Sequence, residues 1–260
     1  MELIRIQGDD YDRYENLLIQ RDNLRKDAGS IQIAYIKEFG DLINKSFAAK
    51  IDCIKLKKQI AFCQMSVNKG ETIDMGVLNQ YISKVMDDYK KQLDEMYSDT
   101  EMAKNSHMSS EATVLEVKRL YRRLVKLIHP DINPKTKEQP QLQELWQRVV
   151  SAYHANDKNE LEELEVLIDK VFRDYGDEAI TIEIPNIREK TEALEVEIEK
   201  IRSTDPYQYR YLLENDELVQ EKKEELHKEI EDYNGYRKEL QNIFDEMLLK
   251  NGVKYKWRMS

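Results

Sequence analysis

The distribution of proline limits the possible folds of this chain more than any other feature of its sequence. All five prolines lie after residue 129, and the first 129 residues are rich in Glu, Lys, Leu, Ile and Gln. Proline interrupts helices and most of these residue types favour them, so this stretch predicts long helices. Across the chain, 35% of residues are charged and the mean hydropathy is -0.75, which is typical of a soluble, helix-rich protein.

Apolar residues recur at helical spacing along most of the chain. They predict helices over 11–27, 30–68, 74–104, 114–128, 140–155, 160–172, 186–203 and 207–250. Breaks are expected at 27–30, 68–70 and 205–206, where helix-stopping and capping residues gather. Three short segments alternate apolar and polar residues, and we hypothesise that some of them pair into a very small sheet: 3–6, 179–184 and 253–257. The expected fold class is therefore mainly all-α.

Residues 114–131 combine a two-faced helix with the tripeptide His129-Pro130-Asp131. One face is apolar and is expected to be buried; it consists of Val114, Val117, Tyr121, Leu124 and Ile128. The other side carries five cations: Lys118, Arg119, Arg122, Arg123 and Lys126. Pro130 ends the helix and fixes the backbone, so we expect a rigid, exposed turn.

The chemistry of this turn favours docking on an acidic protein surface. His129 follows the negative end of the helix dipole, which favours its protonated form. Asp131 presents a carboxylate beside the cations, so electrostatics would steer the encounter and one ionic hydrogen bond would fix the register. The alternative interpretation of the tripeptide is an ordinary helix stop with a capping Asp.

At these residues the chain resembles the J domain of DnaJ-type co-chaperones, as a divergent member that matches over about residues 111–170. In that family a basic helix leads into a His-Pro-Asp loop, and an antiparallel helix packs back. Trp146, Val149 and Ala152-Tyr153 are similar to positions of the family's following helix. The family's short first helix, its Gly/Phe-rich linker and its zinc region have no counterpart here. We expect the 74–104 helix to cover the side of the core that the first helix would cover.

The resemblance implies that the protein docks on the ATPase domain of a DnaK-type chaperone and stimulates ATP hydrolysis by that partner. His129, Pro130 and Asp131 would be essential, and the five cations would form the docking surface. The expected architecture is a J-like helical hairpin at 109–175 flanked by long antiparallel or coiled-coil helices. A long-helix hairpin or bundle would occupy 1–108, and a C-terminal helical hairpin would occupy 176–260. These helical arms would select a client protein or a location.

Two other functions compete with the co-chaperone interpretation. The first is a coiled-coil structural or adaptor protein, in which the long helices form a homo-oligomer and the J-like segment is a relic. The second is nucleic-acid binding through the basic helix, but the net charge of -10 opposes it, and we expect no nucleic-acid partner. The acidic segment 160–169 is interpreted as solvated surface; alternatively, it could dock on the basic helix and mask it.

The sequence predicts neither catalytic nor cofactor chemistry of its own. We predict that the protein is not an enzyme, because no phosphate-binding loop or nucleophile–base pair stands out. No third ligand lies near His129 and Asp131, so a metal site is not expected. Cys53 and Cys63 are interpreted as reduced, half-buried thiols. With no long apolar run and no signal segment, we expect a cytoplasmic protein without a membrane partner.

Overall fold

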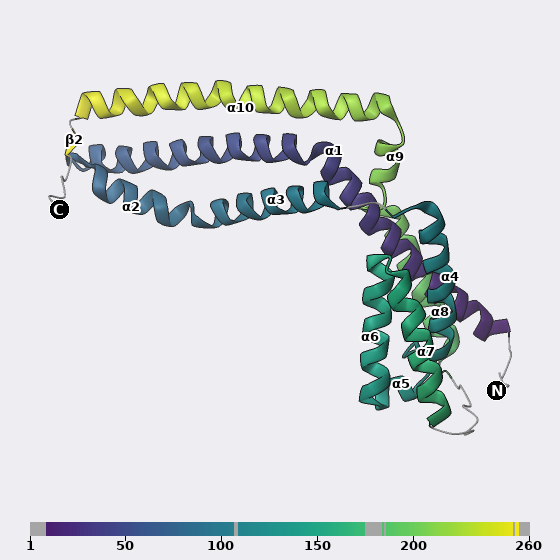
Figure 1. Cartoon of the computed structure of the whole chain (residues 1–260). Helices are drawn as coiled ribbons and strands as arrows, with labels where there is room; N and C mark the ends of the chain where they lie inside the picture. Colours follow the sequence, from purple (N-terminus) through teal and green to yellow (C-terminus); the bar gives the residue numbers. More distant parts are fainter. Residues whose placement is uncertain (1–8, 107–108, 175–183, 185, 252, 255–260) are drawn as a thin grey trace. The chain divides into compact units, whose positions relative to one another are not determined.

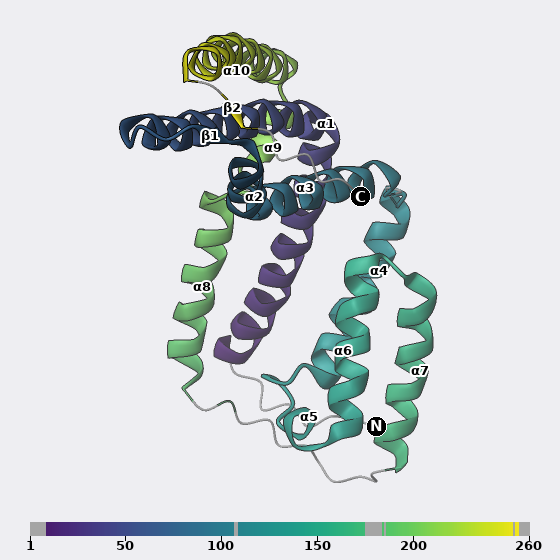
Figure 2. The same cartoon turned by 90° about the vertical axis from the view of Figure 1, so that its left-hand side faces the viewer.

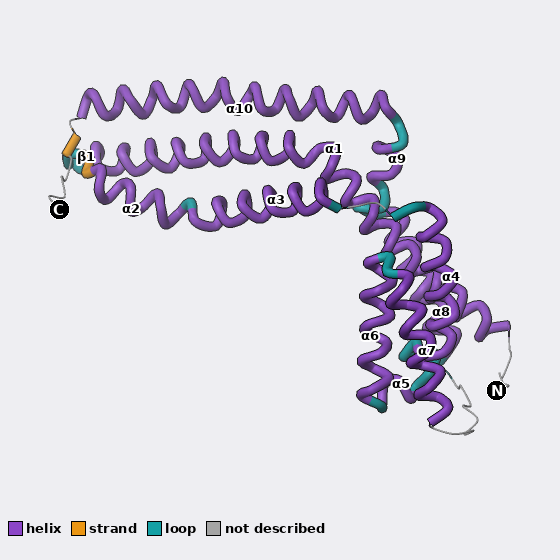
Figure 3. Tube along the Cα trace, viewed as in Figure 1, coloured by secondary structure: helices purple, strands orange, loops and turns teal. Residues whose placement is uncertain are grey.

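Helices dominate the computed structural model, which describes residues 9–106, 109–174, 184, 186–251 and 253–254 (Figure 1). The mainly all-α fold class is confirmed. In the described residues strands occur as one short pair (Figure 3). The elements are α1 (Asp9–Asn68), β1 (Ile73–Asp74), α2 (Met75–Val85), α3 (Asp87–Asn105), α4 (Glu111–Ile128), α5 (Lys135–Glu138), α6 (Pro140–Ala155), α7 (Lys158–Asp174), α8 (Ile187–Ser203), α9 (Tyr209–Leu213), α10 (Asp216–Asn251) and β2 (Val253–Lys254).

The chain divides into two compact units, each assembled from segments that are distant in sequence. Unit 1 comprises residues 1–32 and 107–208, and unit 2 comprises residues 33–106 and 209–260. Helix α1 contributes to both, so we call residues 9–32 its first section and residues 33–68 its second section. The sequence predicted three domains in chain order, at 1–108, 109–175 and 176–260. The difference arises because helical periodicity does not report which distant segments pack together.

Unit 1 is built around α4 and α6, and α7 packs on both of these helices. Figure 2 shows the first section of α1 between α8 and the α4–α6 pair. Ion pairs join this section to both neighbours, from Arg25 to Glu197 of α8 and from Asp27 to Lys118 of α4. The predicted 74–104 helix contributes no described residue to this core. The expectation that it covers the hairpin is therefore wrong, and the first section of α1 packs there.

The ends of α4 and α6 follow from their sequences. Ser110 caps α4, because its Oγ accepts a hydrogen bond from the Thr113 N–H at 3.2 Å. Pro130 follows the last residues of α4, and Pro140 occupies the first turn of α6. The apolar stripe predicted on α4 is buried, except that Val114 is half-buried.

Unit 2 consists of the second section of α1, α2 and α3, α9 and α10. The turn before β1 contains Gly70 with a positive φ of 69°, as the predicted helix stop requires. Helix α3 returns along α1, and Asn44 Nδ2 donates a buried hydrogen bond to Thr100 Oγ1 at 2.9 Å. Helix α10 runs in the same direction as the second section of α1 (Figure 1). The core also buries the two free cysteines, Cys53 and Cys63.

Two sequence-based boundaries and one strand pairing differ from the structure. The break predicted at 27–30 is wrong, because α1 continues through it. Ser30 does not cap a new helix there, since its Oγ donates to the Lys26 carbonyl inside the same helix. The predicted 74–104 helix is divided at Met86 into α2 and α3. Residues 253–254 do form a strand, but it pairs in parallel with β1. The candidate strand 3–6 lies outside the described residues, and so does 179–184 apart from residue 184, which is not in a strand.

Candidate partner-docking site

The loop that contains the tripeptide is held by its own backbone hydrogen bonds. The carbonyl of His129 accepts from the N–H groups of Ile132 and Asn133, at 2.9 and 2.7 Å. The Asn133 side chain is buried, donates to the Leu127 carbonyl at 2.9 Å and accepts from the Lys135 N–H at 3.1 Å. These hydrogen bonds order the loop. The sequence predicted an exposed turn, but His129 is buried and Pro130 and Asp131 are half-buried.

His129 is not exposed and protonated, as the sequence suggested. Its side chain packs edge-on against Trp146, with ring centroids 4.8 Å apart, and the residue is only 4% exposed. Burial lowers the pKa of His129 from 6.5 to about 4. That difference corresponds to about 3 kcal/mol, whereas a helix terminus supplies only about 0.3–1 kcal/mol. Desolvation therefore outweighs the dipole, and the imidazole is neutral at pH 7.

The neutral imidazole orients the acidic residue of the tripeptide. His129 Nδ1 accepts a hydrogen bond from the Asp131 N–H at 3.0 Å, which places the imidazole proton on Nε2. The His129 side chain thus fixes the backbone of Asp131, and its role is structural within this loop.

Asp131 is half-exposed and already carries a cationic neighbour. Lys137 Nζ lies 2.8 Å from its Oδ1. Partial burial raises the pKa of Asp131, but the hydrogen bond from Lys137 and nearby positive charges outweigh this, so the pKa lies below its ordinary value. Burial, together with the charge of Asp131, raises the pKa of Tyr14 to about 12. Asp131 is therefore ionised, and its Oδ1 already has a cationic partner in Lys137.

Three of the five predicted docking cations contact the first section of α1. Lys118 pairs with Asp27 at 3.0 Å, and Lys126 pairs with Glu15 at 2.6 Å. Between them, Arg122 Nη2 donates to the Asn16 side-chain oxygen at 2.8 Å. These contacts run antiparallel along the two helices.

The remaining two cations have different surroundings. Arg123 makes a bidentate interaction with Glu165 of α7, with distances of 2.6 and 2.9 Å. Glu165 belongs to the acidic segment 160–169, so part of that segment docks on the basic helix and is not solvated surface. Arg119 is exposed.

The residues of α6 that carried the resemblance occupy the same core. Tyr153 stacks on Tyr121 with ring centroids 3.8 Å apart, and Val149 and Ala152 are buried. Trp146 is half-buried beside His129. The structure thus brings the loop and the predicted α6 positions together in one packed hairpin.

Sequence reasoning missed the residues of α1 that face this hairpin. Asp22 accepts a hydrogen bond from the Tyr121 hydroxyl at 2.8 Å, and Lys26 donates to the Tyr153 carbonyl. Together with Glu15, these charged residues are buried. One sequence feature could have indicated that these residues face another helix: Glu15 and Asp22 are seven residues apart, beside the apolar stripe of the 11–27 helix. This spacing does not reveal which helix they contact.

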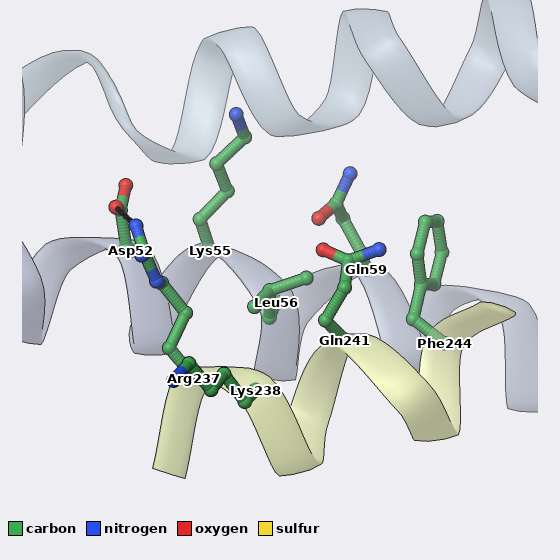
Figure 4. A pocket seen from close by; sticks show the side chains of 8 residues that line it. All are labelled: Asp52, Lys55, Leu56, Gln59, Arg237, Lys238, Gln241 and Phe244. Atoms are coloured by element: carbon green, nitrogen blue, oxygen red, sulfur yellow. Dashed lines mark hydrogen bonds and ion pairs between the residues drawn. The ribbon is translucent and has the colours of Figure 1, made fainter. Parts of the chain in front are cut away.

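Unit 2 offers an open groove of about 470 Å³ between the second section of α1 and α10 (Figure 4). Lys55, Arg237 and Lys238 line it together with the single carboxylate of Asp52. Arg237 Nη1 donates to Asp52 Oδ2 at 2.9 Å, which leaves two cations without a carboxylate in the lining. This balance suits an anionic group, but the lining holds no nucleophile–base pair.

The described part of the chain shows neither a metal-binding cluster nor a membrane-spanning helix. No group of three His, Cys, Asp or Glu side chains there is arranged to hold a metal ion. In the same residues, none of the helices combines the length and the apolar character needed to cross a membrane. No protein-family model, curated protein or solved structure matches the chain.

Proposed function

We propose that this protein is a J-domain co-chaperone that docks on a DnaK-type chaperone and stimulates its ATP hydrolysis. The observation that carries the proposal is the packed α4–α6 hairpin with His129-Pro130-Asp131 in an ordered loop at its tip. The basic helix, the tripeptide and the Trp146 to Tyr153 positions resemble the J domain as a single set. Here the apolar residues of α4 and α6 share one core, and His129 packs against Trp146 beside it. An ordinary helix stop would not require these distant positions to meet.

The chemistry of the loop supports a docking role over catalysis. Asp131 is ionised, half-exposed and held in place through its backbone by His129. A directional carboxylate of this kind can form an ionic hydrogen bond with a cation near the chaperone's interdomain linker. The cations of α4 would supply the electrostatic complementarity to an acidic chaperone surface. The helices of unit 2 would select the client or the location.

The test is single-turnover ATP hydrolysis by a DnaK-type chaperone mixed with the full-length protein. We expect wild type to raise the rate and Asp131→Asn to abolish this effect, because the ionic hydrogen bond to the partner is lost. Asp169→Asn removes the same charge from an exposed position of α7 and serves as the matched control. If wild type does not stimulate, or if Asp131→Asn stimulates equally, the proposal is wrong.

A coiled-coil adaptor is the second candidate function, and it rests on unit 2. Its long helical segments are the second section of α1, α2–α3 and α10, and of the 36 residues of α10 the buried ones are Leu226, Leu240 and Phe244. Such helices could also pack between copies of the chain. Analytical ultracentrifugation tests this alternative. An oligomer that persists at nanomolar concentration would favour the adaptor, and a monomer would oppose it.

A further inference from the structure

We propose that the first section of α1 is a releasable, autoinhibitory cover on the docking face of α4. The inference rests on the proposed function, because the covered surface is the one that would meet the chaperone. Lys118, Arg122 and Lys126 form one line along α4 and are bound by Asp27, Asn16 and Glu15. A chaperone surface and the first section of α1 cannot occupy this line of side chains at the same time.

The groups that α1 presents are those that an acidic partner would present. Glu15 and Asp27 supply carboxylates to two cations, and Asn16 supplies a side-chain oxygen to the third. At the edge of the same basic face, Glu165 of α7 binds Arg123 in a bidentate interaction. The basic face is therefore largely satisfied within unit 1, and partner binding becomes an exchange of one set of acidic groups for another.

Charged residues are buried at the contact between α1 and the hairpin. They lie beside apolar residues of α1 that belong to the core of unit 1, namely Tyr11, Tyr14, Leu18 and Ile19. Glu15 is only 2% exposed, and its Oε2 accepts no hydrogen bond from the described residues. Lys26 is 5% exposed, and burial lowers its pKa to about 8. Asp22 is buried as well and is held by Arg21 and Tyr121. Desolvating such groups offsets most of what their pairing contributes, so the charged part of the contact adds little to holding α1 in place.

The consequence is that only the fraction of molecules with a displaced first section binds the chaperone. The apparent affinity for the chaperone is then the intrinsic affinity multiplied by that fraction. Loosening the cover therefore strengthens docking without any new contact to the partner. The covering groups lie on α1, outside the resemblance to the J domain at 111–170, so they can be changed while the tripeptide and all five cations are retained.

The experiment measures stimulation of single-turnover ATP hydrolysis against protein concentration for wild type, Asn16→Ala/Asp27→Asn and Glu15→Gln. The first variant alters exposed or half-exposed side chains and leaves the buried core intact. We expect half-maximal stimulation at a concentration roughly fivefold lower than for wild type, the factor that corresponds to a loss of about 1 kcal/mol. Glu15→Gln keeps the shape of the buried side chain and is expected to shift the curve in the same direction.

Asp12→Asn is the matched control, because it removes one carboxylate from an exposed position of the same helix. It should leave the concentration dependence unchanged. If the covering variants coincide with wild type while Asp131→Asn abolishes stimulation, the cover is wrong and the docking function stands. If no protein stimulates, including the loosened variants, the proposed function itself is wrong.

Discussion

The two sides of α4 are satisfied in physically different ways. Towards α6 the helix buries aliphatic and aromatic side chains, including Leu124 and the Tyr121–Tyr153 stack. Towards the first section of α1 it adds Lys118, Arg122 and Lys126, in ion pairs and a hydrogen bond, beside the apolar residues that α1 contributes to the same core. Apolar burial is lost only by exposing the surface to water, whereas an ionic contact can be replaced by another acidic surface. The comparison indicates that apolar burial holds the hairpin together, and that the ionic part of the α1 contact is the part that a partner can replace.

Truncating the apolar side of α4 should have the largest effect. Leu124 is fully buried, so Leu124→Ala is expected to destabilise the hairpin by about 2–5 kcal/mol through lost burial and a residual cavity. Hydrogen exchange of the α4 and α6 amides measures this locally, and unit 2 amides provide the internal control. Unchanged protection of the α4 and α6 amides would contradict the account, because it would mean that the apolar core does not hold the hairpin together.

Acid should weaken the hairpin through His129. Its pKa is about 4 in the folded chain and ordinarily 6.5, so the unfolded chain binds more protons between these values. Stability should therefore fall by about 3 kcal/mol as the pH drops from 6.5 to 4, with no contribution from this group above pH 6.5. The measurement is α6 amide protection at pH 7 and pH 4.5. His129→Gln should lose this pH dependence, and His227→Gln, changed at an exposed residue of α10, should retain it.

Removing a buried charge should tighten the cover. Burial lowers the pKa of Lys26 from 10.5 to about 8, so at pH 7 its charge opposes the contact, and the contact strengthens as the pH rises from 8 to 10.5. Lys26→Met keeps the length of the side chain and is expected to stabilise the first section of α1 by about 1–2 kcal/mol. Slower amide exchange in residues 9–32 and weaker chaperone stimulation are the expected results. Faster exchange would show that the lysine holds the cover in place.

Neutralising an exposed pair should have the smallest effect on stability. Asp27 and Lys118 are both partly exposed, so Asp27→Asn is expected to cost at most about 1 kcal/mol. High salt should reduce the difference between this variant and wild type, because solvent ions screen exposed charges. Thermal unfolding followed at low and high salt checks this. A large loss of stability that salt does not reduce would contradict the polar, exchangeable character of the contact.

Local patterns predicted the hairpin, whereas they did not predict its cover. The periodicity of α4, Pro130 as its stop and Pro140 as the start of α6 are short-range signals, and the structure follows them. The pairing of Glu15 with Lys126 joins segments far apart in sequence, so spacing along one helix could not reveal it. The burial of His129 was missed for a similar reason, because Trp146 comes from another helix.

Native-state hydrogen exchange of the full-length protein tests the comparison between cover and hairpin most directly. Amides of residues 9–32 should open at a lower free energy than those of α4 and α6, and a DnaK-type chaperone should speed their exchange while the hairpin stays protected. Equal opening free energies for the two regions, or slower exchange of residues 9–32 when the chaperone binds, would contradict a releasable cover.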